Sequence, residues 1–259
     1  MGRPFAISLD GPVAQLRLTR PDKHNAFDEE LVAGLTSAFT QLEADEAVRV
    51  VVLSGEGKSF CAGADAGWMR RQSTMPPAEN LEDARRLAKL LRAAGTFPKP
   101  LVACVQGAAF GGGMGLACCA DIVLASDTAL FALSEVRLGL IPAVISPWVI
   151  RRIGLSACRR LTLTGERIGG AEALRWGLAD LVVPPDELEA RTQTQVQALL
   201  VGAPGAQAEA KALYLRLHPV DETHLELTAQ AIASRRATAE AREGLSAFLE
   251  KRSPQWGGA

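Results

Sequence analysis

The chain has 259 residues, of which 48% are hydrophobic and 22% charged, and its formal net charge is −1. This composition fits a globular protein with a sizeable core, and the small net charge gives no electrostatic case for a nucleic-acid partner. No apolar run reaches the length of a membrane span, and the N-terminus lacks the apolar core of a signal peptide. Five cysteines without a C-x-x-C pair and three scattered histidines predict reduced thiols and no metal site. We therefore expect a cytoplasmic protein without a membrane partner.

The first part of the chain alternates predicted strands and helices, with loops that enter helices after strand ends. In chain order we expect strands at 5–9 and 13–18, a helix at 29–42 with Asp28 as its N-cap, a strand at 48–53, a loop at 56–65, a helix at 81–94, and strands at 100–105, 122–125 and 129–133. This order favours an α/β fold with largely parallel strands. From about Glu187 the pattern becomes helical, at 187–200, 206–217 and 223–248, which predicts a helical layer on the α/β body or on another subunit.

Three consecutive glycines, Gly111 to Gly113, follow the predicted strand at 100–105 and lead into a helical run of small residues. Glycine has no Cβ, so a ligand can approach its backbone closely, and the N–H groups at a helix start point outward unpaired. Such a corner can hold a phosphate, a carboxylate or a carbonyl oxygen that becomes negative during a reaction. A tight strand–helix crossing is the structural alternative. A dinucleotide-binding oxidoreductase is disfavoured, because the full glycine spacing and the acidic residue downstream are absent.

A second loop of small residues, Cys61 to Asp65, follows the strand at 48–53. Two such loops can each direct one N–H group at the same oxygen, or they can be unrelated turns; their spacing does not show that they meet. Glu135 stands in the apolar run 131–142, where a carboxyl group tends to have a raised pKa that suits proton transfer. Pairing with Arg137 or capping of a turn is the alternative. His24 has the residue type of a base, but a lone histidine in a turn is more often structural.

Taken together, these segments resemble the enoyl-CoA hydratase/isomerase (crotonase) superfamily. The resemblance is carried in order by the segments 20–26 (RPDKHNA), 59–65 (SFCAGAD), 107–113 (GAAFGGG), 161–167 (LTLTGER) and 171–178 (AEALRWGL). Each motif alone is weak, whereas the ordered set is specific and spans nearly the whole chain. The resemblance implies a spiral of β-β-α turns that forms the core over residues 1–190. It also implies a C-terminal helical region over 191–259 that supports a homotrimer or a dimer of trimers.

The resemblance also implies an active site for an acyl-CoA thioester, in which coenzyme A is part of the substrate and no further cofactor is needed. Family members bind the thioester oxygen between two backbone N–H groups, which match Ala64 and Gly112 here. The match to Glu135 implies the catalytic carboxylate. Positions that line the substrate path match the following residues: Lys23, His24, Ala26, Ala62, Asp65, Ala66, Gly111, Gly115, Ser134 and Pro142.

The chain departs from the family pattern at Gly115, where two-carboxylate hydratases carry a glutamate. Three possibilities follow: a hydratase that works with Glu135 alone, a Δ3-Δ2 isomerase in which one carboxylate moves a proton, and a homologue that binds CoA or associates with RNA without catalysis. The segment 133–147 is similar to the bacterial branch acting on 3-methylglutaconyl-CoA and isohexenylglutaconyl-CoA, which favours the hydratase. Gly115 is then expected to make room for a substituent on C3. A distal carboxylate of such a substrate would need a cation, for which the candidates are Arg70, Arg71 and Arg137.

Overall fold

The computed structural model describes residues 3–256 and contains a six-stranded sheet in the order β1-β2-β3-β4-β6-β9. β1 (Phe5–Asp10) and β2 (Val13–Leu18) pair antiparallel, as predicted, and all later neighbours are parallel. The remaining strands of this sheet are β3 (Val50–Gly55), β4 (Leu101–Val105), β6 (Ile122–Ser126) and β9 (Leu181–Val183). The expected α/β class with largely parallel strands is confirmed.

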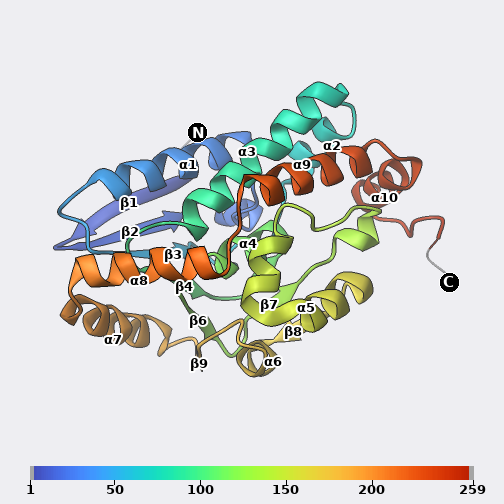
Figure 1. The fold of residues 1–259 in the computed structure, drawn as a ribbon. Helices are drawn as coiled ribbons and strands as arrows, with labels where there is room; N and C mark the ends of the chain where they lie inside the picture. The colour runs from blue at the N-terminus through green and yellow to red at the C-terminus, as the bar shows by residue number, and fades with distance from the viewer. Residues whose placement is uncertain (1–2, 257–259) are drawn as a thin grey trace.

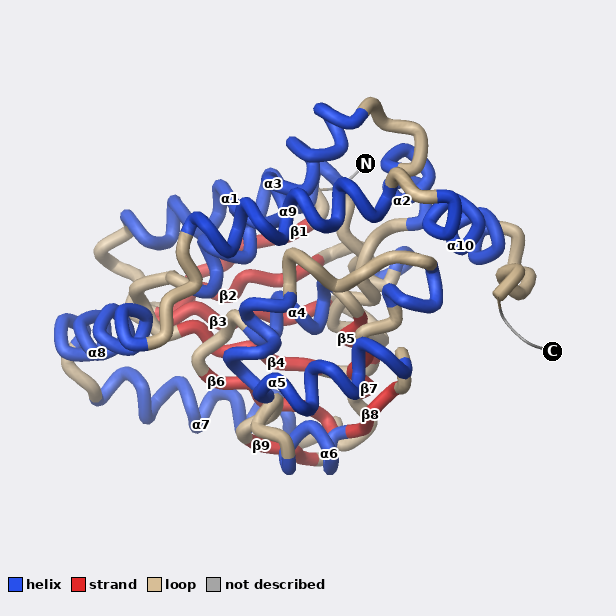
Figure 2. Tube along the Cα trace, turned by 45° about the vertical axis from the view of Figure 1, so that its right-hand side comes forward, coloured by secondary structure: helices blue, strands red, loops and turns tan. Residues whose placement is uncertain are grey.

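Helices cover both faces of this sheet, which explains why its central strands are apolar throughout. Along β3, Val51 and Leu53 belong to the main core with α1 (Glu29–Ala44) and α3 (Pro77–Gly95), whereas Val50 and Val52 pack with α7 (Leu188–Val201) on the opposite face. Alternate residues of a strand point to opposite faces, and a parallel sheet covered on both sides shows unbroken apolar runs. Figures 1 and 2 show α1 and α3 on one side of the sheet and α7 on the other.

A second, three-stranded sheet has the order β5-β7-β8 and lies beside α4 (Gly112–Cys118). Its strands are β5 (Ala108–Phe110), β7 (Leu130–Ala132) and β8 (Arg167–Gly169). α4 begins within the glycine run rather than after it. Four further helical elements connect the strands. α2 (Ala66–Gln72) follows the loop at 56–65, and the 3-10 helix η2 (Glu135–Leu138), α5 (Ser146–Thr164) and α6 (Gly170–Arg175) lie between β7 and β9.

The tail forms four helices: α7, α8 (Pro204–Leu217), α9 (Glu222–Arg236) and α10 (Ala239–Leu249). The single helix expected over 223–248 is therefore wrong. The chain breaks after Ala237 because the Thr238 side chain accepts a hydrogen bond from the Ala241 N–H and starts a new helix. The expected boundary between residues 190 and 191 falls inside α7, and the division into a core and an oligomerisation region stays a prediction. None of the helices between residues 3 and 256 combines the length and apolar character that a membrane span needs.

Candidate active site

The two loops singled out by the sequence lie side by side through backbone pairing. The Cys61 N–H donates to the Ala108 carbonyl (3.0 Å), and the Phe110 N–H donates to the Cys61 carbonyl (3.0 Å). On the other side, the Phe27 N–H donates to the Gly63 carbonyl (2.7 Å). The loop at 56–65 thus joins the edge of the small sheet through an isolated bridge at Cys61, and the small residues of both loops come together. This contact could not be derived from the spacing of the motifs.

Two glycines allow this close approach. A Cβ on Gly113 would overlap the Cys61 carbonyl group, and a Cβ on Gly63, whose φ is +96°, would lie 3.1 Å from the Phe110 carbonyl oxygen. The ring of Phe27 packs against Gly112, where a Cβ would lie 2.9 Å from it. Side chains larger than hydrogen would separate the loops, so the glycines serve the assembly of the site.

Two backbone N–H groups of the site are left free by this pairing. In the bridge between Phe27 and Ala64, Phe27 bonds the residues on either side of Ala64, through Gly63 and Asp65. The Ala64 N–H therefore points away from Phe27. The Gly112 N–H opens α4, where the first intrahelical bond is that of Gly115 to the Gly111 carbonyl (2.9 Å). Within residues 3–256 neither the Ala64 nor the Gly112 N–H donates a hydrogen bond, so both can bind an oxygen atom from a ligand.

Glu135 lies directly against the glycine run. A Cβ on Gly111 would lie 2.8 Å from Glu135 Oε1, and Gly111 immediately precedes Gly112. Glu135 Oε2 is buried without a hydrogen-bond partner among the described residues. Burial raises the pKa of Glu135 from its ordinary value of 4.5 to about 7. An unpartnered buried carboxyl group of this kind can exchange a proton with a ligand near neutral pH.

The alternative role for Glu135, pairing with Arg137, is wrong for this structure. Arg137 Nη2 donates to the Thr164 carbonyl (3.3 Å) at the end of α5. Arg71 is bound to Glu29 through two hydrogen bonds of 2.9 and 2.6 Å. Arg70 is exposed, and its side chain forms neither an ion pair nor a hydrogen bond with any of residues 3–256, whereas Arg71 and Arg137 each have a hydrogen-bond partner.

The space beside Gly115 is filled, contrary to the expectation that this glycine leaves room for a substrate substituent. A Cβ on Gly115 would lie 2.6 Å from the Cβ of Ile145, which is 3% exposed. Ile145 therefore occupies the position toward which a side chain at residue 115 would point. Sequence reasoning missed Ile145, because nothing in the apolar segment between Pro142 and Pro147 indicates contact with α4.

The predicted substrate-path residues of the N-terminal half gather around the Ala64 loop. The Ala62 N–H donates to the His24 carbonyl (3.0 Å), and the Ala26 N–H to the Lys23 carbonyl (3.0 Å). His24 Nδ1 forms a hydrogen bond with Ser59 Oγ at 3.0 Å. The residue is exposed and has a φ of +50°, which fits a structural role in the turn. Ala66, exposed, begins α2. These contacts form one edge of the site from two distant segments.

Asp65 caps α2 and carries the charge of this edge. Its carboxylate accepts from the Gly67 N–H (2.8 Å) and lies 3.4 Å from Lys23 Nζ. Partial burial raises the pKa of Asp65, but the N–H groups of α2 and the Lys23 ammonium together hold this pKa below its ordinary value. In the second half, Ser134 directly precedes Glu135 at the start of η2, and the buried Pro142 lies in the loop between η2 and α5. Neither contributes a side-chain hydrogen bond to another described residue.

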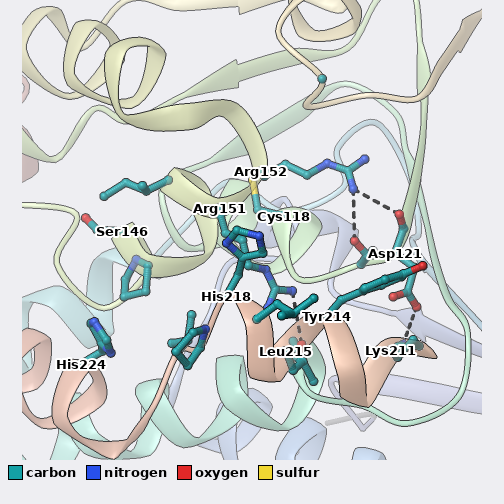
Figure 3. Close-up of a pocket in the computed structure, with 18 of the residues that line it drawn as sticks. Cys118, Asp121, Ser146, Arg151, Arg152, Lys211, Tyr214, Leu215, His218 and His224 are labelled. Atoms are coloured by element: carbon teal, nitrogen blue, oxygen red, sulfur yellow. Dashed lines mark hydrogen bonds and ion pairs between the residues drawn. The ribbon is translucent and has the colours of Figure 1, made fainter. Parts of the chain in front are cut away.

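A separate pocket of about 1150 Å³ lies between α5 and α8 and is lined by none of the predicted site residues. Its charged groups are mostly paired: Lys211 with Asp121 (2.5 Å), and Arg152 with Asp180. Figure 3 shows Lys211 beside Asp121 along one wall, with His218 and Tyr214 nearby. No group of three or more His, Cys, Asp or Glu side chains within residues 3–256 is arranged to hold a metal ion.

The family model described as enoyl-CoA hydratase/isomerase matches residues 9–259. The chain belongs to this family. An enoyl-CoA hydratase from Shewanella pealeana ATCC 700345 is 45% identical, with a TM-score of 0.80 over 98% of this chain and 96% of its own. The 1,2-epoxyphenylacetyl-CoA isomerase of Escherichia coli K12 is 35% identical over 98% of both chains. The carnitinyl-CoA dehydratase of Salmonella typhi is 32% identical over the full length of both.

These relatives confirm the predicted family and the crotonase-like fold with C-terminal helices. The chain is an enzyme of the enoyl-CoA hydratase family, whose type reaction is that of a hydro-lyase. The names of the relatives nevertheless cover a hydratase, an isomerase and a dehydratase. Family membership therefore does not by itself choose the reaction.

Proposed function

We propose that this enzyme adds water across the 2,3 double bond of an enoyl-CoA and that Glu135 is its single acid–base group. The observation that carries the proposal is the buried, unpartnered Glu135 carboxyl group beside two free backbone N–H groups. In the reaction, Glu135 takes a proton from water as the water oxygen bonds to C3. The negative charge that develops on the thioester oxygen is bound by the Ala64 and Gly112 N–H groups. C2 then takes the proton from Glu135, which regenerates the carboxylate.

No cofactor beyond the CoA group of the substrate enters this mechanism. The raised pKa of Glu135, about 7, suits the proposal because one group must both accept and return the proton. Five free cysteines, four of them buried, support a location in a reducing cytoplasm. Burial raises the pKa of Cys61 to about 12, so this thiol in the loop stays protonated and leaves proton transfer to Glu135.

The substrate class we propose is a branched glutaconyl-CoA thioester. Arg70 lies on α2, close in sequence to Ala64, and is the candidate cation without a partner among the described residues. It is suited to bind the distal carboxylate. Replacing Arg70 by Gln should lower kcat/KM for 3-methylglutaconyl-CoA about tenfold, as expected for one charge-assisted bond, and leave crotonyl-CoA unaffected. Arg71→Gln is the matched control, since Arg71 is already bound to Glu29.

One assay tests the reaction class. The enzyme is incubated separately with crotonyl-CoA, 3-methylglutaconyl-CoA and a 3-enoyl-CoA, and the absorbance of the conjugated thioester is followed. A hydratase removes this absorbance from the first two substrates. A gain of absorbance from the 3-enoyl-CoA alone would instead establish the isomerase, which the single carboxylate also permits. Binding of CoA esters without turnover would establish the non-catalytic homologue.

We further propose that a second copy of the chain covers α8, as the trimer or dimer of trimers requires. α8 buries none of its residues against the described part of its own chain, and Leu213, Tyr214 and Leu217 are 46%, 63% and 63% exposed. Exposed apolar side chains gathered on one helix mark an interaction surface. Light scattering should give a trimer or hexamer mass, and Leu213→Glu combined with Leu217→Glu should lower it. A monomer at micromolar concentration would contradict this assembly.

A further inference from the structure

The corner between α9 and α10 is linked to both halves of the proposed active site through two consecutive arginines. Arg235 Nε donates to the Gly139 carbonyl (2.6 Å), and its guanidinium also pairs with Glu240 of α10. Gly139 ends η2, the short helix that begins at Glu135, and has φ of +68°. α10 touches the same segment: a Cβ on Gly139 would lie 2.7 Å from the Glu240 carbonyl carbon. The position of η2 is therefore set by the tail.

The next residue, Arg236, is linked to the other half of the site through α3. Its Nη1 donates to Asn80 Oδ1 (2.9 Å) and to Asp83 Oδ2 (3.1 Å) on α3. Arg236 and Asp83 are 6% and 3% exposed. Asp83 in turn accepts hydrogen bonds from two residues of α2, Trp68 Nε1 (3.0 Å) and Gln72 Nε2 (2.7 Å). Because α2 begins directly after Asp65, this network fixes the helix that follows the Ala64 N–H.

A buried charge pair of this kind gives a defined geometry rather than extra stability. The free energy needed to remove the two charged groups from water offsets their mutual attraction, whereas removing one partner leaves the other as an unpaired buried charge. Each oxygen of Asp83 is occupied by a donor, so α2, α3 and α9 have one arrangement that satisfies the network. Because Arg235 and Arg236 are adjacent in the chain, the corner at residues 235–238 connects this network directly to η2.

We propose that Arg235 and Arg236 are positioning residues that hold the Glu135 segment and the Ala64 segment in mutual register. The inference rests on the proposed function, since it assigns the acid–base group to one segment and an oxyanion donor to the other. Arg235 acts through Gly139 and η2. Arg236 acts through Asp83, Trp68 and α2. Neither arginine touches the substrate.

Each side of the corner has its own variant and readout. Arg235→Gln removes the donor to Gly139, which allows η2 to shift and lets water reach Glu135. The groups that face η2 are Cys158 of α5, Glu240 of α10 and Arg235 itself, while Arg137 points to Thr164. We expect kcat to fall about tenfold with KM unchanged within a factor of two, and the acid limb of the kcat/KM profile to move below pH 7. Arg235→Lys should restore part of kcat.

Trp68→Phe tests the other side, because it keeps a buried aromatic ring and removes the N–H that binds Asp83, at the cost of the volume by which indole exceeds phenyl. Its readout is the C=O stretching frequency of bound butyryl-CoA, a saturated thioester that the enzyme does not convert. Hydrogen bonds to the carbonyl oxygen lower this frequency. We expect the lowering to be smaller in Trp68→Phe than in the wild type, while the pH profile of turnover stays unchanged. The control is Arg85→Gln, which breaks the ion pair of α3 with Glu226 of α9 (2.7 Å) and touches neither segment.

The outcomes separate the inference from the function on which it rests. If bound butyryl-CoA shows no carbonyl shift in the wild type, the proposed oxyanion site is wrong and the inference is overturned with it. If the wild type shows the shift, but Arg235→Gln and Trp68→Phe match Arg85→Gln in kcat, pH profile and carbonyl frequency, only the positioning role is overturned. A pH shift confined to Arg235→Gln and a carbonyl change confined to Trp68→Phe would support both roles.

Discussion

Replacing Glu135 by Gln should abolish turnover and, at the same time, stabilise the fold. The amide has nearly the shape of the carboxyl group but can neither lose nor gain the catalytic proton. In the folded protein burial raises the pKa of Glu135 from 4.5 to about 7, so the charged form is disfavoured by folding. The stability that this group contributes is present below pH 4.5, where both states are protonated, and is lost as the pH rises toward 7 and above.

The magnitude follows from the two pKa values. A pKa near 7 in the fold against 4.5 in the unfolded chain costs the wild type about 3 kcal/mol at pH 8 and under about 1 kcal/mol at pH 5. Glu135→Gln does not carry this cost. We therefore expect its free energy of unfolding to exceed that of the wild type by about 2.5 kcal/mol more at pH 8 than at pH 5.

The measurement is urea unfolding of both proteins at pH 5 and pH 8, with the mass of the assembly checked under each condition. Glu43→Gln serves as the control, because Glu43 is exposed at the end of α1 and the same replacement there removes no buried carboxyl group. The reasoning would be refuted if Glu135→Gln showed the same stability difference at both pH values. Residual turnover above one hundredth of wild type would refute the catalytic assignment separately.

Further predictions concern the Ala64 N–H, the pH dependence of turnover, the contact between Gly115 and Ile145, and the buried ion pair of Asp83 with Arg236. Ala64→Pro removes one N–H and should lower kcat by 100-fold or more, about 3 kcal/mol of barrier, while CoA-ester binding persists in a titration. Wild-type kcat/KM should rise with pH through about 7, because the reaction starts from the Glu135 carboxylate; a flat profile from pH 5 to 9 would contradict this. Gly115→Ala should destabilise by about 1–3 kcal/mol through overlap with Ile145, and adding Ile145→Ala should recover most of the loss in thermal unfolding. Asp83→Asn leaves Arg236 charged and buried, and should cost about 3–5 kcal/mol in urea unfolding.

The regular elements of this fold could be predicted because each has a local signal. Antiparallel β1 and β2 follow from alternation around a tight turn, and α1 follows from its period and from Asp28, whose side chain accepts the Leu31 N–H at 2.9 Å. The break between α9 and α10 was missed because residues 235–243 are all Ala, Arg or Glu except Thr238, which alone marks the cap there. α5 was missed for the opposite reason, since Pro147 and the non-helical Gly154 interrupt its pattern.

The site was predictable in its components but not in its contacts. The glycine run and Glu135 were identified from residue type and from the resemblance, and the structure places Glu135 against Gly111. Their neighbours come from remote segments: Ile145 from α5's entry loop, and Arg235 and Arg236 from the tail. A single sequence contains no local signal for such pairings, because they depend on how helices pack rather than on spacing.

Ile145 changes what the missing glutamate at residue 115 means. If the space beside Gly115 were open, the chain could be seen as a hydratase that has lost one carboxylate and gained space. Ile145 instead fills the space that a side chain at residue 115 would take, so position 115 supplies no second acid. A second carboxylate would share a proton with Glu135 and repel its charge, whereas an apolar wall raises its pKa by burial alone. The pair Gly115 and Ile145 thus suits a site in which one carboxyl group near pH 7 both accepts and returns the proton, and the substituent of a branched substrate must find its room elsewhere around C3.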